Sequence, residues 1–108
     1  MSSFDERQKN FENKFVHDEE LRFKIASRRR KLLGLWAAEE MGLGDEESLS
    51  YTLGVIACGI EDTTPGAVIN KIRTDAEKRQ VTLTEAQIRA KNAEFEIIAT
   101  KQISGNKK

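Results

Sequence analysis

The stretch that decides the fold is Asp18-Glu19-Glu20-Leu21-Arg22-Phe23-Lys24-Ile25-Ala26-Ser27-Arg28-Arg29-Arg30-Lys31-Leu32-Leu33-Gly34-Leu35-Trp36-Ala37-Ala38-Glu39-Glu40-Met41. Apolar residues recur in it at helical intervals and trace one face of a helix, namely Leu21, Ile25, Leu32, Leu35 and Trp36. Asp18 is a suitable N-cap, and Gly42 with Gly44 supplies a natural stop. The pattern predicts a long helix from about Asp18 to Met41.

Three further helices are expected after this one. The first has Asp45 as its N-cap and an apolar face made of Leu49, Leu53, Ile56 and Ile60. The second starts at Thr64 and Pro65, ends near Lys78, and has inward positions Val68, Ile69, Ile72 and Ala76. The third starts with a Thr84-x-x-Gln87 capping box and a Leu83–Ile88 staple, and has inward positions Ile88, Phe95, Ile98 and Ala99.

These helices with short connections predict an all-α fold, a four-helix bundle. We expect an N-terminal segment at residues 1–17, the bundle at residues 18–103 and a frayed tail at residues 104–108. The central residues Trp36, Leu53, Ile72 and Phe95 are expected to be buried together. Gly34 and Gly54 lie inside predicted helices, where glycine is unfavourable, and are expected to allow close helix packing.

The N-terminal segment has an aromatic stripe on an otherwise polar chain. Phe4, Phe11 and Phe15 fall on one helical face, and Ser3 with Glu6 forms a capping box. An isolated helix of about a dozen residues is marginal in water. We therefore expect residues 1–17 to be mobile or only partly helical when free, and to need a surface on which to dock.

Charge is balanced overall but divided along the chain. The 18 basic and 18 acidic residues give zero net charge and no general attraction to nucleic acid or anionic membranes. Residues 1–38 hold nine basic and six acidic residues, whereas residues 39–62 hold seven acids and no Lys or Arg, so the two stretches can attract each other. With no signal peptide and no membrane span in the sequence, we expect a cytoplasmic protein.

Catalytic and metal chemistry find little support. A single Cys58, expected to be a buried structural thiol, and a single His17 leave no disulfide, zinc site or Cys–His pair. Consecutive residues point in different directions on a helix, so the run from His17 to Glu20 is not expected to bind metal. We expect neither an enzyme nor a metal protein.

The basic run Arg28-Arg29-Arg30-Lys31 is a candidate phosphate or nucleic-acid contact. The same helix has a core-facing apolar side, and no glycine-rich phosphate loop occurs in the chain. A solvated or internally paired face is the favoured interpretation. The alternative function is a small nucleotide- or nucleic-acid-binding module that uses these four residues.

Residues 4 to 38 also resemble a known family. The pattern is Phe4-Asp5-x-Arg7-x-x-x-Phe11-Glu12-x-Lys14-Phe15-x-His17-Asp18-Glu19-Glu20-Leu21-Arg22-Phe23-Lys24, followed by Arg28-Arg29-x-Lys31-Leu32-Leu33-Gly34-Leu35-Trp36-Ala37-Ala38. It is similar to the zeta subunits of alphaproteobacterial ATP synthases, and Gln87-Ile88-Arg89 adds a smaller agreement.

The resemblance implies a regulatory inhibitor of ATP hydrolysis that is peripheral to the inner membrane through the ATP synthase and monomeric when free. Its N-terminal segment would enter a catalytic interface between alpha and beta subunits near the gamma rotor. Carried onto this chain, the partner-binding residues are Phe4, Asp5, Arg7, Phe11, Glu12, Lys14 and Phe15. Weak ATP or ADP binding is also implied by the family, without a required cofactor.

Overall fold

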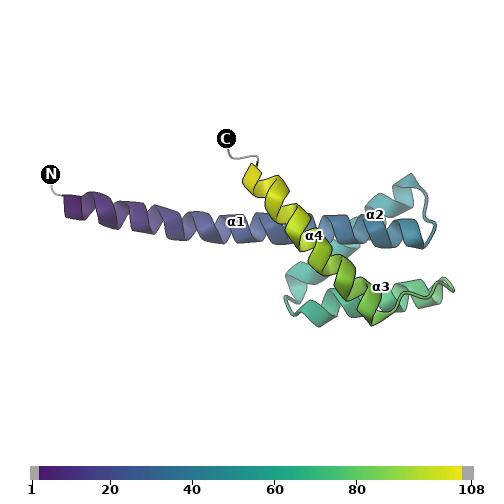
Figure 1. Cartoon of the computed structure of the whole chain (residues 1–108). Coiled ribbons are helices and arrows are strands. Elements are labelled where there is room, and N and C mark those ends of the chain that lie inside the picture. The colour runs from purple at the N-terminus through teal and green to yellow at the C-terminus, as the bar shows by residue number, and fades with distance from the viewer. Residues whose placement is uncertain (1–2, 106–108) are drawn as a thin grey trace.

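Four α-helices make up the fold, and the expected all-α class is confirmed. The computed structural model describes the backbone of residues 3–105 and the side chains of residues 18–105. The helices are α1 (Ser3–Glu40), α2 (Asp45–Glu61), α3 (Pro65–Lys78) and α4 (Glu85–Gly105) (Figure 1). Residues 106–108 of the expected tail lie outside this description, and α4 continues past the expected end at Ile103.

Helix α1 crosses the expected boundary at Asp18 without a break, because the chain has no Gly or Pro from Ser3 to Leu33. It ends at Gly42, whose φ of 73° is the left-handed conformation that glycine adopts freely. The amide of Leu43 donates to the Ala38 carbonyl and that of Gly42 to the Glu39 carbonyl, both at 3.0 Å. This pair of hydrogen bonds is a Schellman stop, as the two glycines predicted.

The molecule is elongated, with extents of 66 × 26 × 21 Å. In Figure 1 the N-terminal half of α1 extends well beyond the other helices. Helix α4 crosses the middle of α1, and the helices α2 and α3 lie near the C-terminal half of α1. The helical bundle is therefore built on the second half of α1. The first half projects from it.

The later helices begin where their predicted capping residues place them, but two of the expected caps differ in the structure. Pro65 occupies the first turn of α3, and the Thr84 hydroxyl accepts a hydrogen bond from the Gln87 amide at 3.1 Å while the Gln87 side chain accepts one from the Thr84 amide at 2.9 Å. The expectation that Asp45 caps α2 is wrong, since Gly44 is the N-cap and Asp45 is already helical. Thr64 does precede α3, but its hydroxyl donates to Asp62 instead of capping the helix.

One apolar cluster joins all four helices and the loops between them. Its members are Leu33, Ala37, Met41, Val55, Val68, Ile69, Ile72, Ala76, Leu83 and Ile88. The inward face predicted for α3 is confirmed at all four positions, and in α4 Ile88 and Ala99 are fully buried. In α1 the predicted stripe is only half-buried, because the deepest side chains come from the adjacent positions Leu33, Ala37 and Ala38.

The face predicted for α2 is wrong. Its buried residues are Thr52, Val55 and Gly59, whereas Leu49, Leu53 and Ile60 are exposed and Ile56 is half-buried. The expected meeting of Trp36, Leu53, Ile72 and Phe95 fails for the same reason. Ile72 is fully buried with Trp36 and Phe95 packed against the cluster, but Leu53 is 67% exposed. Cys58, expected to be buried, is half-buried against the cluster.

Small residues explain why α2 turns this side inward. A β-carbon on Gly34 would lie 3.0 Å from the Thr52 Cα and 3.2 Å from its Cγ2 methyl, so the backbones of α1 and α2 approach too closely for a side chain. Gly34 therefore serves close packing as predicted. Gly54 does not, since a β-carbon there would meet only the Lys71 side chain at 3.8 Å.

We predict that Gly34→Ala lowers the free energy of unfolding by about 1–2 kcal/mol, although alanine is the better helix former, because the two helices must move apart. Gly54→Ala is the matched control and should be neutral or stabilising by up to about 1 kcal/mol. Urea unfolding followed by circular dichroism measures both. Equal effects of the two substitutions would show that the helices do not meet at Gly34.

Candidate functional site

The first candidate site is the N-terminal part of α1. The side chains of Phe4, Asp5, Arg7, Phe11, Glu12, Lys14 and Phe15 lie outside the described residues. The backbone from Ser3 onward is helical, and a helical repeat places positions 4, 11 and 15 within about 40° of one another around the axis. The structure thus supplies the helix that the aromatic spacing predicts, on a part of the molecule that projects from the bundle (Figure 1).

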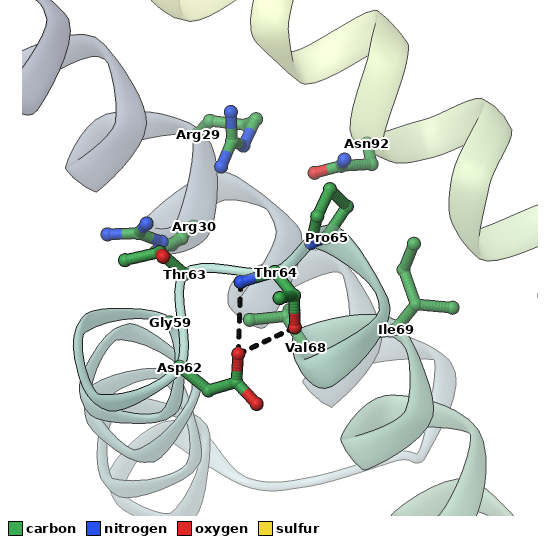
Figure 2. A pocket seen from close by; sticks show the side chains of 10 residues that line it. All are labelled: Arg29, Arg30, Gly59, Asp62, Thr63, Thr64, Pro65, Val68, Ile69 and Asn92. Carbon is green, nitrogen blue, oxygen red and sulfur yellow. Dashed lines mark hydrogen bonds between the residues drawn. The ribbon is translucent and has the colours of Figure 1, made fainter.

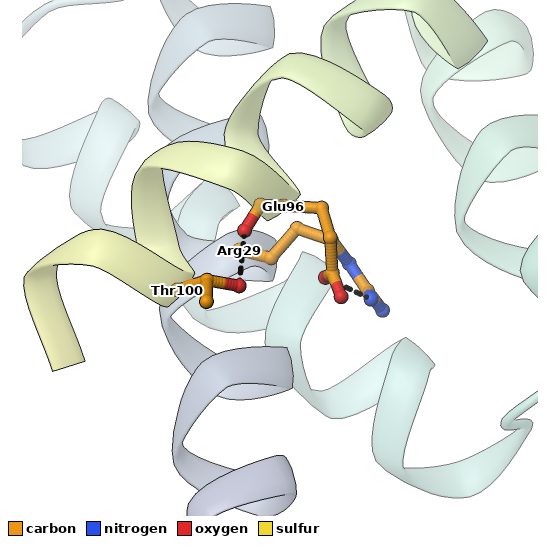
Figure 3. A network of polar contacts seen from close by, with 3 residues as sticks. All are labelled: Arg29, Glu96 and Thr100. Carbon is orange, nitrogen blue, oxygen red and sulfur yellow. Dashed lines mark hydrogen bonds and ion pairs between the residues drawn. The ribbon is translucent and has the colours of Figure 1, made fainter. Parts of the chain in front are cut away.

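The second candidate site is the basic run of α1, Arg28 to Lys31, whose four side chains lie in different surroundings. Arg28 donates from Nη1 to the Gln102 side chain at 3.1 Å, and Lys31 is exposed. The Arg29 guanidinium pairs with Glu96 of α4 at 2.9 Å, as Figure 3 shows. The expected attraction between α1 and the acidic α2 is not realised as an ion pair among residues 18–105, because α4 supplies the partners of Arg28 and Arg29.

Figure 3 also shows a second hydrogen bond at Glu96, on its backbone. The Thr100 hydroxyl donates to the Glu96 backbone carbonyl at 2.7 Å, one turn along α4. The ion pair is partly solvated, with the Glu96 side chain 49% exposed, so it contributes at most about 1 kcal/mol. It fixes the direction of Arg29 more than it stabilises the bundle.

Arg29 and Arg30 meet at a pocket of about 210 Å³. Figure 2 shows them above the α2–α3 turn, where Thr63, Thr64 and Pro65 lead into α3 and Asn92 of α4 closes another side. Two guanidinium groups, an amide and the positive end of a helix favour an anion. Asp62, whose carboxylate accepts from the Thr64 amide and hydroxyl, lies at the rim and opposes one.

Arg30 is the unusual member of this pocket. Only 9% of the residue is exposed, and its guanidinium lies across Gly59, where a β-carbon would overlap its Nε atom. No hydrogen bond or ion pair joins this guanidinium to another described residue. In Arg29 the Nε atom is buried without an acceptor, although Nη1 of the same group donates to Glu96. Burial, and then the neighbouring charge of Arg29, lower the pKa of Arg30. The pocket therefore holds one arginine that pairs with Glu96 and a second, Arg30, that has no ionic partner among residues 18–105.

Sequence reasoning found the two arginines of this pocket but not their surroundings. Gly59, Thr63 and Asn92 come from α2, the following turn and α4, and no spacing in the sequence links them to Arg30. The turn between α2 and α3 is held by two hydrogen bonds that the amide and hydroxyl of Thr64 donate to the Asp62 carboxylate. The same hydrogen bonds lower the pKa of Asp62.

A helical bundle with one helix that projects far beyond it defines a small all-α protein. The family follows from the match of a family model, described as ATPase inhibitor subunit zeta, to residues 1–102. The chain belongs to this family. Its members are regulators of an ATPase and not enzymes, and the family implies an interaction with ATP synthase. No curated protein matches the chain.

We predict that Arg30→Met raises the free energy of unfolding by up to about 1 kcal/mol, because an apolar side chain of similar length avoids the desolvation of a charge that has no ionic partner. Lys31→Met, one residue away but exposed, is the control and should leave stability unchanged within about 0.5 kcal/mol. The midpoint of urea unfolding reports both. A loss of stability in Arg30→Met would mean that the guanidinium has found an acceptor.

Proposed function

We propose that this protein inhibits ATP hydrolysis by the catalytic head of ATP synthase, and that it does so by inserting residues 1–17 at a catalytic interface between alpha and beta subunits near the gamma subunit. The observation that carries the proposal is the projection of α1 beyond the bundle in a chain of the zeta family. A projecting helix can enter a cleft between subunits, which a bundle 21 to 26 Å across cannot.

Affinity would come chiefly from the three phenylalanines. Burying Phe4, Phe11 and Phe15 contributes about 1.5–3 kcal/mol each before the costs of association. Asp5, Arg7, Glu12 and Lys14 lie between them and would form the polar rim of the contact.

The protein would be peripheral to the inner membrane through this partner. Among the residues that the structure describes, no helix combines the length and apolar character that crossing a bilayer needs. Among residues 18–105 the buried residues lie between Arg30 and Ala99, so we expect a chain without residues 1–17 to keep this core.

We predict that full-length protein suppresses steady-state ATP hydrolysis by the cognate catalytic head, and that a chain of residues 18–108 remains folded but does not inhibit. Phe11→Ala should raise the half-inhibitory concentration about tenfold to a hundredfold, since it removes the middle anchor. Asn13→Ala, at a position about 180° from Phe4 around the helix, is the control and should inhibit like the parent.

Circular dichroism checks that each variant is folded. If the truncated chain inhibits as well as the full chain, the inhibitory surface lies on the bundle and the insertion mechanism is wrong.

A second candidate function, weak binding of phosphate or nucleotide, is favoured by one observation. The pocket of Arg29 and Arg30 contains guanidinium donors without acceptors next to the start of α3. We infer that this pocket accommodates a phosphate group of a nucleotide, and that the negative charge of Asp62 at its rim limits the affinity.

We predict that titration with ATP, followed by amide chemical shifts, perturbs Thr63, Thr64 and Gly66 in the parent protein and in Lys31→Met. The same titration should have at least tenfold weaker effect in Arg30→Met, which removes the buried charge. If Arg30→Met and Lys31→Met gave identical titrations, nucleotide would bind elsewhere than in this pocket. A titration with inorganic phosphate in place of ATP tells whether the phosphate group alone is sufficient for binding.

A further inference from the structure

The outer face of α2 carries a row of large apolar side chains that nothing in the described molecule covers. Leu49, Leu53 and Ile60 are 60%, 67% and 53% exposed, and half-buried Ile56 completes the row. Their spacings of four, three and four residues place them on one side of the helix. We call these four residues the α2 stripe. Such a row on one exposed face is typical of a protein–protein contact.

The stripe continues into a groove between α1, α2 and α4. This groove has a volume of about 310 Å³, and its apolar residues are Ile56, Phe23 and Ile103. Phe23 is itself 60% exposed. Basic side chains of α1, Lys24, Arg28 and Lys31, line the groove at this end. A partner lying on the stripe would therefore bury apolar surface from three helices.

Away from this basic end of the groove, the charges that α2 and its flanking loops themselves carry are all acidic. From Glu39 to Asp62 the chain has seven carboxylates and no Lys or Arg, and all seven acidic residues are exposed. Within the part of the chain whose side chains are described, none of them is in an ion pair. Glu46 and Glu47 share a pocket with Lys71 and Arg79 on the α3 side, but Lys71 pairs with Asp75 instead.

These charges argue against a second copy of the chain as the occupant. Two α2 helices related by a twofold axis and packed antiparallel would bring Glu46 and Glu47 of one copy to Glu61 and Asp62 of the other. Like charges at both ends would oppose such a dimer. A helix with basic residues beside its apolar face meets the same carboxylates favourably.

We propose that the α2 stripe is a second docking surface, and that it binds an amphipathic helix of the catalytic head whose apolar side is flanked by Lys or Arg residues. The proposal rests on the proposed function, because it takes the head as the partner. It assigns the bundle a separate task. Contact at the stripe holds the protein on the head and raises the local concentration of the N-terminal segment at its cleft.

This division gives the two surfaces different signatures. Loss of the stripe weakens binding but leaves the inserted segment intact, so full inhibition is still reached when enough protein is added. Loss of the N-terminal segment removes inhibition even at saturation. The half-inhibitory concentration and the maximal inhibition therefore distinguish the two surfaces in one assay.

The decisive variant is Leu49→Ser/Leu53→Ser in the full-length protein, since both side chains are exposed and the substitutions leave the core untouched. The control is Ile97→Ser on α4, whose side chain is 59% exposed on another helix. We expect the stripe variant to raise the half-inhibitory concentration and the dissociation constant from the head at least tenfold, with unchanged maximal inhibition, and the control to match the parent.

A charge-reversal pair tests the chemistry of the partner. Glu46→Lys/Glu61→Lys should weaken binding several-fold at low salt, with a smaller difference at high salt, whereas Glu77→Lys on α3 should not. Tighter binding by the reversed variant would mean an acidic partner and overturn the proposal.

Direct binding to the immobilised head, measured beside inhibition, keeps this test separate from the proposed function. If the parent binds but does not inhibit, the proposed function fails while the stripe is still tested by the binding constants. Equal binding by Leu49→Ser/Leu53→Ser and Ile97→Ser overturns the proposal. So does sedimentation that shows a dimer of the parent and a monomer of the stripe variant, since the occupant is then a second copy.

Discussion

The close approach of α1 and α2 at Gly34 and Thr52 is the contact on which the rest of the structure depends. With no side chain at Gly34, the two backbones pack at a distance that suits only small neighbours, and α2 therefore turns Thr52, Val55 and Gly59 toward α1. The Thr52 hydroxyl, which this contact buries, donates to the Ser48 carbonyl at 2.7 Å, so no hydrogen-bonding group is lost. Both the burial of Arg30 over Gly59 and the exposure of the α2 stripe follow from this one rotation of α2.

The same contact shows where sequence reasoning succeeded and where it could not. Helices α3 and α4 were placed well because their caps and their large inward residues, such as Ile72 and Ile88, give the same answer. In α2 the hydrophobic pattern and the packing geometry favour different faces of the helix. Its larger residues, Leu49 and Leu53, suggested one face, but the geometry of packing against Gly34 selected the face of small residues. Hydrophobicity alone does not reveal how near two helices will come, so this error could not be avoided from one sequence.

The candidate sites divide in the same way. The aromatic spacing of Phe4, Phe11 and Phe15 is local, and the helical backbone found there is what the spacing predicts. The pocket of Arg29 and Arg30 is not local, because Asn92 and Thr63 reach it from distant parts of the chain. Arg30 itself is largely buried and has no ionic partner among residues 18–105, which is unfavourable for folding.

The uninterrupted course of α1 through Asp18 has a mechanical consequence. A helix that continues into the bundle without a break acts as a rod with a wider base, which is the bundle itself. The 20 residues from Ser3 to Arg22 precede Phe23, which lines a groove with Ile103 of α4, and their helical rise corresponds to a rod of about 30 Å. If α1 is inserted as proposed, the bundle would meet the rim of the cleft and limit how deep the helix can go. The length of α1 beyond the bundle would then set how far its first residues reach, and an insertion of one helical turn near Asp18 would advance that reach by about 5 Å.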